Sequence, residues 1–363
     1  MGRMEPAHTE EVADRYARFA EHETAHHSAV MQAWAEGIAS DPEVCALIST
    51  LPPRERQPNL VMAAARMLHP GLVDPHQREA RPDEYDLLRE VLLGRWDEVR
   101  EITARRHTQT NEAGRLAAVL PVLHHIAETT GRELALVEFG ASAGLALHPH
   151  WWQFRYVDRD GSLISQFGPS DRPEITVMVK DHLDNPDRTQ VPHVPVPTRV
   201  PPIMWRLGVD LNPLDPARPA DADWLRTLIW PGQSHRLERL DAAIEAARRD
   251  PVLVLRHDIT DEDAIDAVLR LIPRDYLPVV MHGAVLAYLG AHDRAAFGEQ
   301  MLRRVAAGEL RWISNEGKYV VPQVVQALDE RPEFSRRLRR GAFVVALDGV
   351  PMYQADGHAG WVL

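Results

Sequence analysis

At Leu134 the sequence changes from amphipathic helical runs to short apolar runs typical of strands. This change constrains the fold more than any other feature. The run Leu134–Phe139 (LALVEF) is short and apolar, and Gly140 follows it at once. This pattern is typical of a buried parallel strand that ends in a tight turn. Similar runs recur at Trp205–Leu211, Val252–Arg256, Pro278–His282 and Leu310–Ser314. Helical stretches separate several of them, so the pattern predicts an α/β fold with a parallel sheet covered on both faces.

The region before Leu134 predicts helices only. Apolar residues recur with a period close to 3.6 from Glu11 to Ile38, and Asp41-Pro42-Glu43 has the pattern of an N-cap followed by a first-turn proline and acid. Further amphipathic runs follow at 59–68, 83–93, 96–106 and 111–128. We therefore expect an N-terminal helical region over residues 1–95 and an α/β domain over residues 96–363.

Residues 147–202 interrupt the alternation of strands and helices. They contain a turn signal at Asp160-Gly161 and the proline-dense stretch VPHVPVPTRVPP. Proline removes the amide donors that a central strand needs, so we interpret this stretch as an insertion that either caps a ligand site or covers one face of the sheet. Near the end of the chain, Asp348-Gly349 predicts a terminal β-hairpin between Phe343–Leu347 and Gly360–Leu363.

Composition and charge argue against several classes of protein. Lys and Arg number 41 against 53 Asp and Glu, a net charge of −12, which disfavours binding to nucleic-acid phosphates. A single cysteine, Cys45, excludes structural disulfides and thiolate-rich metal sites and is typical of a cytoplasmic protein. No apolar run approaches the ~18 residues of a membrane helix, and MGRMEPAHTE lacks a signal-peptide core. We expect a cytoplasmic protein without membrane or nucleic-acid partners; oligomeric state is open.

The turn after Leu134–Phe139 is the first candidate ligand site. In VEFGASAGL, the acid Glu138 precedes Gly140, Ser142 and Gly144. An acid at a strand end, followed by glycines that open a helix, lets backbone amides approach a nucleotide-like ligand closely, because glycine carries no Cβ. The same glycines also serve tight strand–helix packing in many folds. The turn alone therefore leaves both interpretations open.

Polar residues at the ends of the later strands strengthen the ligand-site interpretation. They are Asp210 and Asn212 in GVDLNP, Asp258, His282, Asn315 and Glu316. The carboxyl ends of parallel strands line the crevice where doubly wound sheets bind ligands. Asp210 stands where such folds place the carboxylate that binds ribose hydroxyls, and Asp258 where a side chain reaches an adenine amino group.

This series of motifs resembles the class I S-adenosylmethionine-dependent methyltransferases over roughly Asn111 to Leu363, mainly through VEFGASAGL and GVDLNP. The resemblance implies a methyltransferase-like doubly wound sheet and S-adenosylmethionine as cofactor. Ser142 replaces the middle glycine of the usual GxGxG. Asp210 lies 72 residues beyond Glu138, where about 20 is normal, and we attribute the excess to the insertion. Asp158 has the normal spacing but runs into the predicted hairpin.

Nearly the whole chain is also similar to a bacterial family known only as a domain of unknown function. Its members share RxTQTNExGR, which is Arg106–Arg115 here with His107 at the second position, as well as the glycine turn and DLNP. This second resemblance implies the same methyltransferase-like fold. It implies no established activity.

Methyl transfer requires the acceptor to be aligned with the activated methyl group and water to be excluded. His282 is the candidate base, because an imidazole titrates near neutral pH. A histidine merely packed against the sheet is the alternative. Asn315 and Glu316 are candidate groups for orienting the substrate.

Candidate substrate contacts lie outside the strand ends. Thr110, Asn111 and Glu112 begin the helix that precedes the glycine strand, either as one wall of the cofactor site or only as a helix cap. Trp230, in WPGQ, interrupts a helix and marks either a kink or a substrate-facing turn. We expect a small-molecule substrate, whose identity the sequence does not reveal.

Three other interpretations compete. GASAG matches the GxSxG elbow of α/β-hydrolases, with Ser142 as nucleophile and Asp258 and His282 completing a triad, but only helices precede the elbow here. His22–His26 matches the zinc motif HExxH without a third ligand, so we expect no metal. The third is a non-catalytic module that binds a nucleotide, metabolite or protein partner on the same fold.

Overall fold

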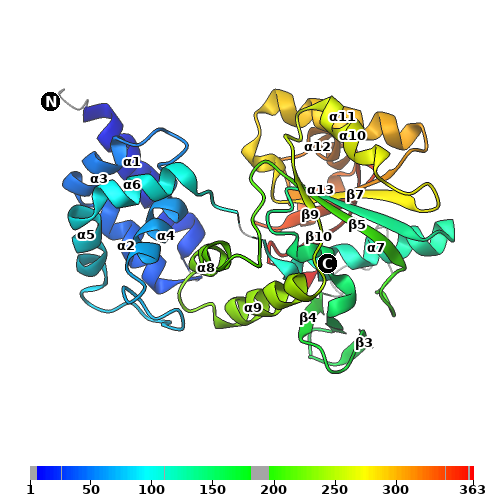
Figure 1. Cartoon of the computed structure of the whole chain (residues 1–363), viewed down its shortest axis with the longest axis horizontal. Coiled ribbons are helices and arrows are strands. Elements are labelled where there is room, and N and C mark those ends of the chain that lie inside the picture. The colour runs from blue at the N-terminus through cyan, green and yellow to red at the C-terminus, as the bar shows by residue number, and fades with distance from the viewer. Residues whose placement is uncertain (1–5, 26, 110, 181–195, 340, 359) are drawn as a thin grey trace. The chain divides into compact units, whose positions relative to one another are not determined.

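The structure is a computed structural model that describes residues 6–25, 27–109, 111–180, 196–339, 341–358 and 360–363 (Figure 1). The chain forms two compact units. The first comprises Met1–Thr110 with Arg218–Asp241, and the second comprises Asn111–Ala217 with Ala242–Leu363. The segment 218–241, which the sequence placed in the α/β domain, thus belongs with the N-terminal helices.

The first unit is helical. Its elements are α1 (Pro6–Phe19), the π-helix η1 (Ala20–Thr24), α2 (Ala29–Ala39), α3 (Pro42–Ser49), α4 (Pro58–Leu68), α5 (Glu84–Gly94), α6 (Trp96–Arg105), α8 (Pro219–Thr227) and the start of α9 (Ser234–Arg249). The predicted periodic run from Glu11 to Ile38 therefore divides into three elements, and Ser28 accepts a hydrogen bond from Met31 N at the start of α2. The predicted N-cap of α3 is confirmed, because Asp41 accepts hydrogen bonds from two first-turn amides.

The second unit is built on a large, mostly parallel sheet. The strands of its described part run in the order β3-β2-β4-β11-β10-β9-β8-β7-β1-β5-β6. Their bounds are β1 Leu134–Phe139, β2 Gln153–Val157, β3 Leu163–Phe167, β4 Glu174–Val179, β5 Ile203–Asp210, β6 Val254–Arg256, β7 Leu277–Gly283, β8 Arg311–Gly317, β9 Phe343–Leu347, β10 Val350–Ala355 and β11 Trp361–Val362. The five strands predicted from apolar runs are confirmed as β1, β5, β6, β7 and β8, and they pair in parallel.

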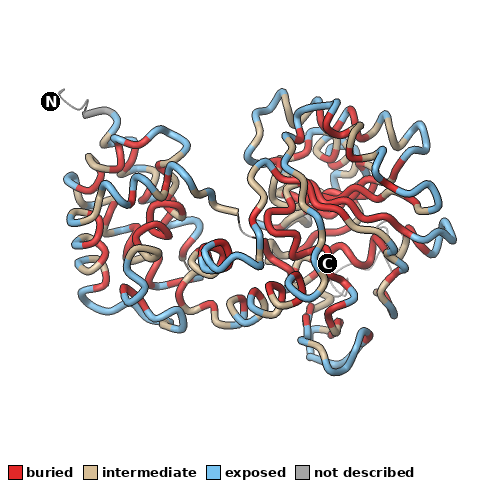
Figure 2. Tube along the Cα trace, in the orientation of Figure 1, coloured by how far each residue is buried: buried red, intermediate tan, exposed pale blue. Residues whose placement is uncertain are grey.

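Helices cover both faces of this sheet, and its central strands β1, β7 and β8 are mostly buried (Figure 2). The elements are η2 (Ala113–Arg115), α7 (Leu116–Thr130), η3 (Leu145–Leu147), η4 (Pro149–Trp151), α10 (Glu262–Arg270), η6 (Leu286–Tyr288), α11 (Ala291–Ala306), α12 (Pro322–Asp329) and α13 (Pro332–Arg337). Val137 and Phe139 of β1 join the core formed by α10, α11 and α12. The opposite face meets α7, whose Ala118 carbonyl accepts a hydrogen bond from the Tyr353 hydroxyl of β10.

The predicted insertion extends the sheet. Strand β4 pairs in parallel with β11 and with β2, and β2 pairs with β3 in the hairpin predicted around Asp160-Gly161. Residues 181–195, which include the first five residues of the proline-dense stretch, lie outside the described residues. The predicted terminal hairpin is half right: Asp348-Gly349 does turn the chain after β9, but the strand that returns is β10, and the last residues form β11 beside it.

Candidate functional site

The turn after β1 requires backbone conformations that L-residues rarely adopt. Gly140, Ser142 and Gly144 have φ angles of 73°, 51° and 69°. A Cβ added to Gly140 would lie 2.5 Å from Cγ2 of Val285, so a side chain at this position meets both strain and a clash. Ser142 holds a left-handed conformation without being glycine, an outlier of the kind that clusters at functional sites.

Asp210 holds this turn in place from the end of β5. Its Oδ2 accepts a hydrogen bond of 2.7 Å from Ser142 N, and its Oδ1 accepts one of 2.8 Å from Asn212 N. On the other side of the turn, Asn111 Oδ1 accepts a hydrogen bond of 2.6 Å from Leu145 N. The two predicted ligand groups are thus also structural supports of the turn.

Glu138 is the most perturbed group near the turn. It is buried at the end of β1, and no described residue forms a hydrogen bond with its Oε2. Burial raises the pKa of this carboxyl to about 8; the nearby Arg115 opposes the rise and Asp210 adds to it. A buried carboxyl with an unpaired oxygen, beside the point where strand order reverses between β1 and β7, marks a candidate functional site.

Arg115 is a member of this site that the sequence analysis did not single out. Its Nε donates to Gly357 O at 3.0 Å, its Nη1 donates to Gly283 O at 3.4 Å, and its guanidinium lies 5.7 Å from the ring centroid of Phe343. The available signal was its place at the end of the RxTQTNExGR motif. The interaction with Glu138 depends on tertiary structure and left no local pattern.

Strand register divides the predicted catalytic set between the two faces of the sheet. His282 pairs with Phe139 of β1 and with Ser314 of β8, whereas Gly283 pairs with Asn315. Paired residues on parallel strands point to the same face, and successive residues alternate. Glu138 and Asn315 therefore share the face that α7 covers. His282 and Glu316 lie on the other face.

His282 and Glu316 form an enclosed pair. Nδ1 of His282 lies 2.9 Å from Glu316 Oε1, and the histidine side chain is 0% exposed. The same Oε1 accepts hydrogen bonds from Val285 N and Leu286 N, each at 3.0 Å. The imidazole stacks on Trp312 with centroids 5.9 Å apart. The pair thus stabilises the turn after β7, and this geometry matches the packed-histidine alternative rather than the candidate base.

The remaining predicted residues of the second unit have varied surroundings. Asn315 is buried, and neither polar atom of its amide has a partner in the portion of the chain that the structure describes. Asp258 is exposed and accepts hydrogen bonds from the amide and hydroxyl of Thr260. Glu112 accepts one from Gly114 N, the helix-cap geometry that was one of its two interpretations. Thr110 lies outside the described residues.

Trp230 belongs to the first unit. Its indole N–H donates to Asn59 Oδ1 at 2.9 Å, and its ring meets Phe19 edge-on with centroids 5.8 Å apart. The WPGQ sequence separates α8 from α9, as a kink would. These contacts stabilise the helical unit, and they do not join Trp230 to the polar groups around Glu138.

The geometry does not support the hydrolase interpretation or the zinc-site interpretation. For the hydrolase interpretation, His282 Nδ1 is held by Glu316, and within the described part of the chain Nε2 has no partner, so no Ser142–His282 hydrogen bond forms. For HExxH, His22 and Glu23 lie in η1 and His26 lies outside the described residues. Across the described chain, no three His, Cys, Asp or Glu side chains converge as metal ligands.

None of the described helices has the length and apolarity of a membrane span.

Comparison with known proteins identifies the family. The model of a family described as an uncharacterised protein conserved in bacteria (DUF2332) matches residues 13–362. The chain belongs to this family. None of the curated proteins matches it.

Proposed function

We propose that the chain is an S-adenosylmethionine-dependent methyltransferase that acts on a small molecule and uses the second unit as a methyltransferase-like domain. The observation that carries this proposal is Glu138, a buried carboxyl with an unpaired oxygen at the carboxyl end of β1. The order β6-β5-β1-β7-β8 supports it, because it repeats the order of a doubly wound nucleotide-binding sheet, with Glu138 beside the switch point.

The residues around Glu138 suit the amino-acid end of this cofactor, which carries an ammonium and a carboxylate. Glu138 would take the ammonium, which gives its unpaired oxygen a donor, and the guanidinium of Arg115 would take the carboxylate. Asp210 would accept from the ribose hydroxyls, and the exposed Asp258 would reach the adenine amino group. Gly140, Ser142, Gly144 and Asn212 would shape the backbone against which the cofactor lies.

The cofactor supplies an activated methyl group, so the chain has to align an acceptor and keep water away. Asn315 shares the face of Glu138 and has both amide atoms buried without partners, and we assign it to orienting the acceptor. His282 and Glu316 are positioning residues, which act through the turn after β7 and do not contact the cofactor or the acceptor. They hold the turn that presses Val285 against Gly140.

Equilibrium titration of the full chain with S-adenosylmethionine and with S-adenosylhomocysteine tests the proposal. We expect saturable binding of both, with one proton released near pH 7 on binding S-adenosylmethionine, because a cation beside Glu138 lowers its raised pKa. Repeating the calorimetry in buffers of different ionisation enthalpy measures the proton. A folded chain that binds neither compound contradicts the proposal, and binding without turnover on any acceptor favours the non-catalytic module.

A further inference from the structure

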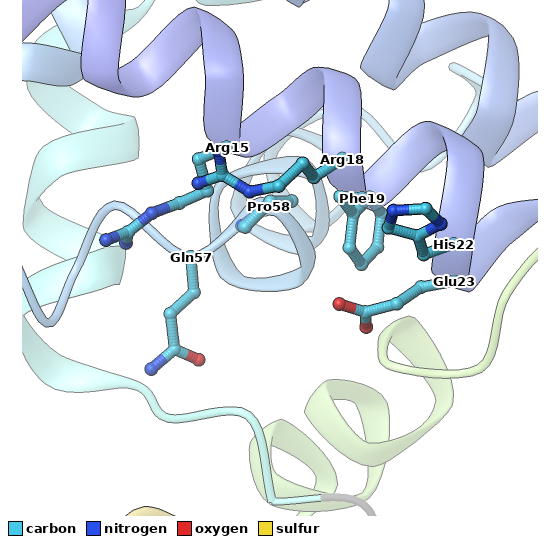
Figure 3. A pocket seen from close by; sticks show the side chains of 7 residues that line it. All are labelled: Arg15, Arg18, Phe19, His22, Glu23, Gln57 and Pro58. Atoms are coloured by element: carbon cyan, nitrogen blue, oxygen red, sulfur yellow. The ribbon is translucent and has the colours of Figure 1, made fainter. Parts of the chain in front are cut away.

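The first unit contains a pocket of about 380 Å³ that the proposed function does not use. Seven residues line it: Arg15, Arg18, Phe19, His22, Glu23, Gln57 and Pro58 (Figure 3). They come from α1, η1 and the start of α4, so a single unit supplies the whole lining. The size lies within the range of small-molecule sites.

The lining is ordered along one stripe of the α1–η1 helix. Arg15, Phe19 and Glu23 follow one another at intervals of four residues, which places them on the same side of a helix. Arg15 and Glu23 are about 12 Å apart along the axis at 1.5 Å per residue. The stripe crosses from α-helix into the π-helix η1, a distortion that is frequent at functional sites. A cation, a ring and an acid thus succeed one another along the pocket.

Hydrogen-bond donors gather at one end. Arg15 and Arg18 are one turn apart, and in Figure 3 both guanidinium groups lie on the same side of the pocket as Gln57. Within the described chain Arg18 makes no ion pair, and Arg15 makes a loose one with Glu11 at 3.5 Å. Gln57 accepts a hydrogen bond from Thr108 through Oε1, which leaves its amide N–H groups for another acceptor. This end suits a carboxylate.

An acid occupies the other end. In Figure 3 the Glu23 carboxylate points into the pocket from η1. Desolvation by neighbouring protein atoms raises the pKa of this carboxyl, although the residue as a whole is exposed, and His22 opposes the rise. Among the described residues no ion pair forms with Glu23. Between the two ends, Phe19 and Pro58 are buried and give the pocket an apolar middle. An ammonium group would relieve the unpaired acid.

We propose that this pocket binds a linear ampholyte, a small molecule with a carboxylate at one end, a primary ammonium at the other and an apolar segment between them. A simple anion would meet Glu23, and a simple cation would meet Arg15 and Arg18. A ligand with both charges pairs with both ends and covers Phe19. The inference stands independently of the methyltransferase proposal, since it rests on the first unit alone.

The test uses 6-aminohexanoate as the probe, with hexanoate and hexylamine as analogues that each lack one charge. The full chain is titrated with all three by ligand-detected NMR. We expect saturable binding of 6-aminohexanoate that is at least fivefold tighter than that of either analogue. No saturable binding overturns the proposal, and so does hexanoate or hexylamine binding as tightly as 6-aminohexanoate.

Two substitutions of exposed residues locate the site. Arg18→Gln and Glu23→Gln should each weaken 6-aminohexanoate at least fivefold; the first should also weaken hexanoate but not hexylamine, and the second the reverse. Arg105→Gln is the matched control, because the Arg105 side chain is 75% exposed on α6 and, among the described residues, forms an ion pair with Glu101 alone. Equal losses in the control, or unchanged binding in both pocket variants, place the ligand elsewhere and overturn the proposal.

Discussion

Two buried glutamates on the strands that flank β7 have opposite surroundings. Glu316 of β8 uses one oxygen to accept hydrogen bonds from a histidine and two backbone amides. Glu138 of β1 is almost as deeply buried, and burial raises its pKa to about 8. Oε2 of each acid has no hydrogen-bond partner among the described residues, so the two differ in the three hydrogen bonds that Glu316 Oε1 accepts. Register places the two side chains on opposite faces of the sheet.

This difference separates a structural acid from an acid kept ready for a ligand. A buried polar group without a partner costs free energy, and native structures retain such groups where a function needs them. Glu316 stabilises the fold through its three hydrogen bonds. Glu138 contributes little of that kind, and we infer that its unpaired oxygen is completed by a bound cation.

The largest expected effect is on stability. Glu316→Ala leaves the His282 ring and the amides of Val285 and Leu286 without their acceptor, and we expect the free energy of unfolding to fall by about 3 kcal/mol. Glu138→Ala removes no comparable set of bonds and should cost about 1 kcal/mol or less. Urea unfolding at pH 7 measures both. Equal losses in the free energy of unfolding for Glu316→Ala and Glu138→Ala would contradict the structural role assigned to Glu316 alone.

The turn that Glu316 holds should also matter to the turn after β1. Gly140→Ala drives a Cβ against Val285 in a backbone region that alanine avoids, and we expect a loss of about 2 kcal/mol in the free energy of unfolding. A Cβ at Gly140 would also lie 2.6 Å from Val285 Cβ, so only Val285→Gly removes the clash; it leaves the strain, and the double variant should recover part of the loss measured against Val285→Gly alone. Thermal unfolding compares the two. No recovery would show that the close approach of Val285 is unimportant.

The raised pKa of Glu138 predicts a specific dependence of stability on pH. The folded chain retains this proton from the ordinary carboxyl pKa of 4.5 up to about 8. Its contribution to stability is therefore complete below pH 4.5, falls as pH rises, and is lost above about pH 8, at no more than ~1.4 kcal/mol per pH unit. Glu138→Gln should lose this dependence, so the variant gains on the wild type by roughly 1–2 kcal/mol between pH 6 and pH 8. If the free energy of unfolding changes with pH in the same way in the wild type and in Glu138→Gln, the pKa of Glu138 is not raised by folding.

The smallest effect on stability is expected at Asp258, an exposed acid whose hydrogen bonds are confined to Thr260. Asp258→Asn retains an acceptor for those bonds and should change the free energy of unfolding by less than about 0.5 kcal/mol. If Asp258 contacts the adenine, the same variant still weakens S-adenosylmethionine binding. A calorimetric titration checks this, and unchanged affinity removes Asp258 from the proposed site.

Local sequence patterns were sufficient to predict where the main strands lie in the chain. They were not sufficient to predict which face of the sheet each side chain occupies. The run Leu134–Phe139 forms β1 with the predicted bounds, because an apolar run and the glycine that ends it are recognisable from residues adjacent in the chain. The separation of His282 from Asn315 depends on strand register, and register is decided by residues far apart in the chain. For the same reason no local pattern indicated that residues 218–241 join the first unit or that Arg115 lies near Glu138.

The most direct test of the difference between the two acids is the affinity of Glu138→Gln for S-adenosylmethionine. The substitution keeps the size of the side chain and removes the charge that would pair with the ammonium, so the dissociation constant should rise at least tenfold. The fold should remain intact by urea unfolding, and proton release on binding should disappear. Wild-type affinity and proton release in this variant would contradict the role assigned to Glu138.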